Sequence, residues 1–111
     1  MSEEIYEVII PPNIYTQLEN IRDYISNVFF APQAANKRIT EIFNTMESLK
    51  TFPERGFSAD KKVGRQISKI SKTYGIVAVG GKYLIFYNIL GREINISYLI
   101  PTKSDYAKLF N

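Results

Sequence analysis

The clearest hydrophobic pattern in the chain lies at residues 82–89, which read Lys-Tyr-Leu-Ile-Phe-Tyr-Asn-Ile. After its first residue this stretch has no charge, no Gly and no Pro, and it is dense in aromatic and branched side chains on both alternating faces. Such a run predicts a β-strand that is covered on both sides. Tyr83 and Tyr87 should share one face, and packing in the core is favoured for both over a role in chemistry.

Glycines on either side of this strand predict two chain reversals. Gly80 and Gly81 favour a tight turn back to the apolar run at residues 76–79, and Gly91 permits a reversal into residues 93–100. In that last strand Ile94, Ile96, Tyr98 and Ile100 alternate with more polar positions and should share one face. The three strands form an antiparallel meander at the centre of the fold.

Two helical stripes precede the meander. Apolar residues at spacings of three and four predict one helix that ends near residue 28 and a second that runs from Pro32 to about residue 50. A short connection makes the pair an antiparallel helical hairpin, whose apolar face should cover the meander. The predicted core comprises Ile14, Leu18, Ile21, Ile25, Ile39, Ile42, Met46, Leu49, Ile85 and Phe86.

The remaining segments give weaker patterns. Residues 4–10 alternate as a strand that Pro11 ends, residues 57–73 are the least structured part, and residues 103–110 could form a short terminal helix. The order of elements predicts an α+β fold in a single domain over residues 1–111. Either the first or the last strand should be an edge of the sheet, open to strand addition from a partner.

Composition excludes several kinds of chemistry. The 111 residues contain no cysteine and no histidine, so disulfides, thiol catalysis and histidine general bases are absent. The acids show no ligand spacing, and we expect no metal and no cofactor. No apolar run is long enough to span a bilayer and the acidic start is no signal peptide, so we expect a cytoplasmic protein that does not contact membranes.

Charge is distributed unevenly along the chain. Residues 1–60 carry five Lys or Arg against nine Asp or Glu, whereas residues 61–111 carry nine against two. A basic half next to an acidic half suggests an anionic partner, although charge alone favours the ordinary alternative of solvated lysines that keep the protein soluble. The candidate contacts with a target or partner protein are Arg65, Lys69, Lys82, Arg92 and Lys103.

Catalysis would depend on few residues. Tyr106 could act as an acid or stack on a base, and Lys103 could steer a phosphate. For both residues the ordinary alternative is favoured, namely ring packing for Tyr106 and a solvated side chain for Lys103.

Four segments in order resemble the RelE/ParE superfamily of bacterial toxins. They are residues 21–25 (Ile-Arg-Asp-Tyr-Ile), 31–35 (Ala-Pro-Gln-Ala-Ala), 49–56 (Leu-Lys-Thr-Phe-Pro-Glu-Arg-Gly) and 79–87, which ends in Tyr-Leu-Ile-Phe-Tyr. The resemblance covers nearly the whole chain. It implies the toxin of a type II toxin–antitoxin pair, silenced by and assembled with a cognate antitoxin.

The resemblance implies one of two mechanisms. RelE-like members cleave mRNA on the ribosome, whereas ParE-like members poison DNA gyrase. Ribonuclease members commonly carry an Arg where this chain has Leu84, and many relatives carry an Arg-Asp pair where it has Ser104 and Asp105, although Tyr106 matches a RelE-like tail tyrosine. Two missing arginines would each remove a charge-assisted bond to phosphate, worth about 1.5–3 kcal/mol. The ParE-like reading, with action by binding rather than catalysis, is therefore favoured.

Two alternatives stay open at this stage. One is a ribosome-dependent endoribonuclease that uses Lys103 and Tyr106. The other is a decayed toxin that serves only as an antitoxin partner.

Overall fold

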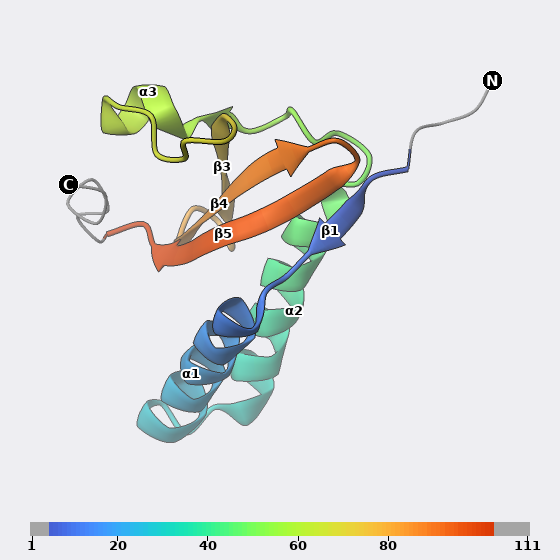
Figure 1. The fold of residues 1–111 in the computed structure, drawn as a ribbon. Coiled ribbons are helices and arrows are strands. Elements are labelled where there is room, and N and C mark those ends of the chain that lie inside the picture. Colours follow the sequence, from blue (N-terminus) through green and yellow to red (C-terminus); the bar gives the residue numbers. More distant parts are fainter. Residues whose placement is uncertain (1–4, 104–111) are drawn as a thin grey trace.

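The computed structural model describes residues 5–103 and shows a five-stranded sheet with the two long helices on one face (Figure 1). The spatial order of the strands is β1-β5-β4-β3-β2. The elements are β1 (Glu7–Ile9), α1 (Pro12–Val28), α2 (Pro32–Ser48), β2 (Phe57–Ser58), α3 (Ala59–Val63), β3 (Thr73–Ala78), β4 (Tyr83–Leu90) and β5 (Glu93–Pro101). The predicted α+β order of strand, helical hairpin and meander is confirmed. No helix among the described residues is both long and apolar enough to cross a membrane.

The apolar faces of the two helices pack on the sheet, as the spacing of their apolar residues predicts. Pro12 and Pro32 each occupy the first turn of a helix, where a missing N–H is harmless. Of the predicted core, Ile21 and Ile39 are only half-buried and pack against its rim. The others are buried: Ile14, Leu18, Ile25, Ile42, Met46, Leu49, Ile85 and Phe86.

The central strand β4 is buried on both faces, as predicted. Ile85 and Tyr87 face the helical hairpin and belong to the larger core cluster. Leu84 and Phe86 face the other side, where Ala59 of α3 helps to cover them. Figure 1 shows α3 and its loop on the side of the sheet away from α1 and α2.

The first strand is an edge of the sheet, which satisfies the expectation that either the first or the last strand would be one. β5 lies between β1 and β4. β1 pairs in parallel with β5 and covers only its first three residues, from Glu93 to Asn95. The prolines after Ile10 end β1 at this point because proline donates no ladder hydrogen bond.

A β-bulge in β5 makes the predicted single face for its four apolar positions wrong. The pairing register shifts between Phe86, which opposes Tyr98, and Tyr87, which opposes Ile96, so Ser97 is an extra residue. Ile96 therefore packs toward the helices, whereas Ile100 packs with the cluster on the other face.

A buried polar network accompanies the bulge. The Ser97 hydroxyl donates to Asn88 Oδ1 at 2.6 Å, and Asn88 Nδ2 donates to Thr73 Oγ1 at 2.9 Å and to the Lys72 carbonyl at 3.0 Å. These bonds connect β3, β4 and β5 at one level. Each polar group of this network has a hydrogen-bond partner, and these bonds offset the cost of removing the Asn88 amide from water.

Residues 57–73 are more ordered than the sequence indicates. Ser58 caps α3 by accepting from the Lys61 N–H at 3.3 Å, and Gly64 ends it with a φ of 90°. The Asp60 carboxylate then accepts from the N–H groups of Ile67 at 2.9 Å and Thr73 at 3.2 Å. The Asp60 carboxylate thus anchors the basic loop between α3 and β3 at two points, Ile67 within the loop and Thr73 where β3 begins.

Candidate functional site

Two of the predicted basic residues line the same hollow. Lys82 and Lys103, with Tyr83 and Thr102, surround an opening of about 430 Å³ where β4 begins and β5 ends. They lie about twenty positions apart in sequence, and the pairing of Tyr83 with Pro101 places them together.

The turn between β3 and β4 forms one wall of this hollow. Gly80 and Gly81 have φ values of 60° and 86°, and the Lys82 N–H donates to the Val79 carbonyl at 3.2 Å. Thr102 fastens the end of β5 to this turn, since its N–H donates to the Lys82 carbonyl at 2.9 Å and its hydroxyl donates to the Gly81 carbonyl at 2.5 Å. The predicted two-glycine turn is confirmed.

The other predicted basic residues lie elsewhere. Arg92 belongs to the turn between β4 and β5, at the opposite end of β4 from Lys82. Arg65 and Lys69 are exposed in the loop after α3, where the Arg65 N–H donates to the Asp60 carbonyl at 3.1 Å. The five cations therefore do not form one site. Tyr106 and the expected terminal helix lie outside the described residues beyond Lys103.

The tyrosines of β4 are structural, as the sequence favoured. Tyr83 is half-buried and packs against the core. Tyr87 is fully buried; its hydroxyl donates to the Pro53 carbonyl at 2.7 Å and accepts from the Gly56 N–H at 3.2 Å. Burial raises the pKa of the Tyr87 hydroxyl above the usual 10.0, and the Gly56 hydrogen bond opposes part of that shift.

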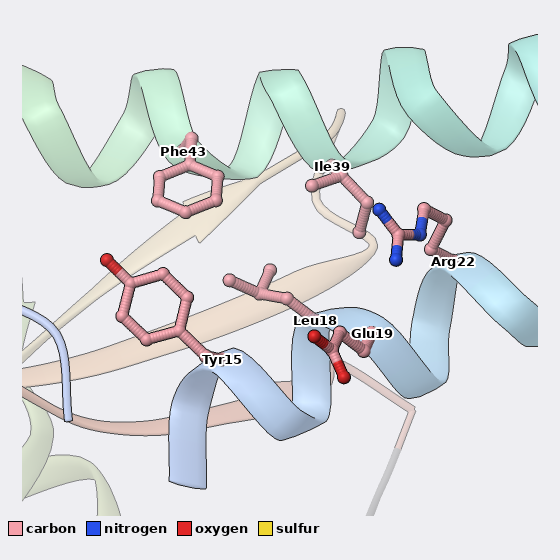
Figure 2. A pocket seen from close by; sticks show the side chains of 6 residues that line it. All are labelled: Tyr15, Leu18, Glu19, Arg22, Ile39 and Phe43. Atoms are coloured by element: carbon pink, nitrogen blue, oxygen red, sulfur yellow. The ribbon is translucent and has the colours of Figure 1, made fainter. Parts of the chain in front are cut away.

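An apolar groove opens between the two long helices (Figure 2). Tyr15 of α1 and Phe43 of α2 face each other across it, with ring centroids 6.0 Å apart. Leu18 and Ile39 lie between them and the charged side chains Glu19 and Arg22 of α1. The groove holds about 160 Å³. The sequence pattern missed it because Tyr15 lies off the predicted apolar stripe.

The second half of β5 offers an open strand edge. β1 pairs with β5 only as far as Asn95, and beyond that residue no strand of the described chain pairs with β5 on the side away from β4. The N–H and C=O groups on that side can bond an added strand.

Comparisons with known proteins give one family match and one structure of similar fold. A family model described as "ParE toxin of type II toxin-antitoxin system, parDE" matches residues 8–106. A solved structure titled "Chromosomal ParDE TA system from P. aeruginosa" has the same fold, with a TM-score of 0.71 at 15% sequence identity, covering 91% of this chain and 100% of that one. Comparison with curated proteins gives no significant match.

Proposed function

Since the chain belongs to the ParE toxin family of type II toxin–antitoxin systems, we propose that it inhibits growth by poisoning DNA gyrase and is neutralised by a cognate antitoxin. The observation that carries the proposal is the family match over residues 8–106, nearly the full chain. In this proposal the toxin acts in the cytoplasm by binding, without a cofactor.

Leu84 supports binding over ribonuclease chemistry. Where the resemblance would place a ribonuclease arginine, Leu84 is 3% exposed and packs in the cluster that contains Ala59 and Ile100. A side chain in that position contacts the core, and it cannot supply the charge that cleavage of a phosphodiester requires.

The groove and the open edge of β5 suit the two parts of an antitoxin. An amphipathic helix can pack apolar side chains into the groove against Tyr15, Phe43 and Ile39, and an extended segment can pair with β5 beyond Asn95. We propose that the antitoxin uses both surfaces and that its extended part is acidic, because the second half of the chain is basic. Toxin and antitoxin would then form a stable hetero-oligomer.

The test is induction of the chain without its antitoxin, with growth, chromosomal breaks and mRNA integrity followed together. Gyrase poisoning predicts arrested growth, DNA breaks and intact mRNA, and co-expression of the antitoxin should restore growth. Rapid mRNA cleavage that is abolished by Tyr106→Phe or Lys103→Ala would replace this function by the ribonuclease. Unimpaired growth would indicate a decayed toxin.

A further inference from the structure

Basic side chains from two distant parts of the chain surround the turn between β3 and β4. On one side, Lys37 and Arg38 of α2 line a hollow of about 200 Å³ together with Val79. On the other side, Lys82 and Lys103 line the hollow described above. Residues of the turn thus line both hollows, each of which contains two cations, and we name these four side chains with residues 79–82 the turn site.

None of the four cations of the turn site forms an ion pair with a carboxylate of residues 5–103, where the one ion pair joins Lys50 to Glu47. Among these described residues, Glu41 is the only acid that lines either hollow, and it does so beside Lys37 and Arg38. Unpaired cations held in one region repel one another and create a positive potential, which a bound anion relieves.

The backbone of the turn is accessible to a large ligand. A Cβ atom placed on Gly80 or Gly81 would meet no heavy atom within 4 Å, so the space above both residues is open. Val79 has a φ of 53°, a left-handed conformation that is strained for a β-branched residue. The fold thus keeps Val79 in a strained conformation, and the exposed backbone of Gly80 and Gly81 lies next to the cations of the turn site.

We propose that the turn site binds the phosphodiester backbone of duplex DNA. Duplex DNA presents about one negative charge per 1.7 Å of axis, which allows separate phosphates to meet Lys37 and Arg38 on one side and Lys82 and Lys103 on the other. Single strands bind instead through stacking on exposed aromatic rings. Within residues 5–103, Tyr83 is the only aromatic residue that lines either hollow, and its ring packs against the core.

The biological role of this DNA binding rests on the proposed function, the poisoning of DNA gyrase. The toxin would bind the DNA segment that is bound to gyrase, in addition to binding gyrase itself. Binding of the DNA alone can nevertheless be measured without gyrase, so the two proposals can fail separately.

The experiment is fluorescence anisotropy of a labelled duplex of about 20 base pairs with the full chain, across a salt series. Four phosphate contacts predict a slope of log K against log salt of about −3.6, which is a loss of the order of 100-fold in affinity between about 50 and 200 mM salt. The double variants Lys82→Ala/Lys103→Ala and Lys37→Ala/Arg38→Ala should each reduce the slope by about 2.

Two single variants serve as matched controls. Arg92→Ala removes a cation from the opposite end of β4, and Lys50→Ala removes one that is already paired with Glu47. Both should leave the slope unchanged. All substituted side chains except Arg38 are exposed, so thermal unfolding should be unchanged in every variant other than Lys37→Ala/Arg38→Ala.

Three results would overturn the turn site: a slope that the double variants do not change, tighter binding of single-stranded DNA than of the duplex, or tighter binding of poly-glutamate than of DNA. Gyrase supercoiling assays on the same preparations separate the proposals. Inhibition of gyrase without DNA binding contradicts the turn site alone, whereas DNA binding without inhibition supports the turn site and contradicts gyrase poisoning.

Discussion

At the scale of single residues, the Tyr87 hydroxyl links the sheet to the turn that follows α2. It contacts the Pro53 carbonyl and the Gly56 N–H, more than thirty positions away in sequence. Gly56 has to be a glycine, because a Cβ there would overlap the Gly75 carbonyl and would lie 2.6 Å from the Tyr87 hydroxyl. Neither contact can be inferred from the alternation of β4, which places Tyr87 in the core but does not name its partners.

Tyr87→Phe should lower the free energy of unfolding by about 1–2 kcal/mol, because the Gly56 N–H and the Pro53 carbonyl lose their partner. Urea unfolding measures this difference. Tyr74→Phe is a matched control, because Tyr74 stacks on Tyr87 at 5.7 Å and its hydroxyl has no hydrogen bond among the described residues. An equal loss in both variants would contradict the structural role of the Tyr87 hydroxyl.

The same residue predicts a pH dependence. Burial raises the pKa of Tyr87 in the folded state, so the folded chain holds this proton more tightly than the unfolded chain. The stabilisation is complete below pH 10.0, the usual tyrosine pKa, and is lost as pH rises through the higher folded value. The wild type should therefore lose more unfolding free energy than Tyr87→Phe between neutral pH and pH above 10.0. Parallel pH profiles for the two proteins would show that the hydroxyl does not titrate in this way.

At the scale of elements, the long periodic segments were predictable and the short ones were not. α1, α2 and β4 each repeat an apolar period over enough residues to be identified. β2 has two residues and α3 has five, so neither contains a full period. The signals that existed for α3 were its ends, the Ser58 cap and the left-handed Gly64. The bulge at Ser97 could not be predicted from the sequence pattern. One extra residue moves the following side chains of β5 to the opposite face of the sheet without changing the composition of the strand.

The site was predictable only in part for a similar reason. The basic half of the sequence contains both Lys82 and Lys103, but their proximity depends on the pairing of β4 with β5. Lys37 and Arg38 belong to the acidic half, and only the packing of α2 beside Val79 brings them to the same turn. The summed charge of residues 1–60 is negative, so it gives no sign that this half also contributes two cations to the turn.

The groove between the helices gives a prediction about the antitoxin. Tyr15→Glu places a charge beside Phe43 and should weaken antitoxin binding by at least 10-fold, about 1.4 kcal/mol, while growth inhibition persists. Isothermal titration with the antitoxin measures the affinity. Tyr24→Glu, at an exposed position of α1 outside the groove, is the control and should bind normally. If both variants bind equally well, the antitoxin does not use this groove.

At the scale of the whole molecule, the proposed surfaces use different residues, although the groove and the turn site both involve α2. The groove lies between α1 and α2, the strand edge uses β5 beyond Asn95, and the turn site lies where β3 turns into β4, with Lys37 and Arg38 of α2 beside it. A partner on one surface need not contact the others. This separation allows the antitoxin and the target to be tested with different variants of one stable scaffold.

The most direct test of gyrase poisoning uses purified components. The chain is mixed with DNA gyrase, ATP and supercoiled plasmid, and the covalent complexes are trapped with detergent before electrophoresis. We expect linear plasmid to accumulate with the chain and gyrase together, and to disappear when the antitoxin is added first. Intact plasmid with an active gyrase, together with cleavage of mRNA on ribosomes by the same preparation, would contradict the account.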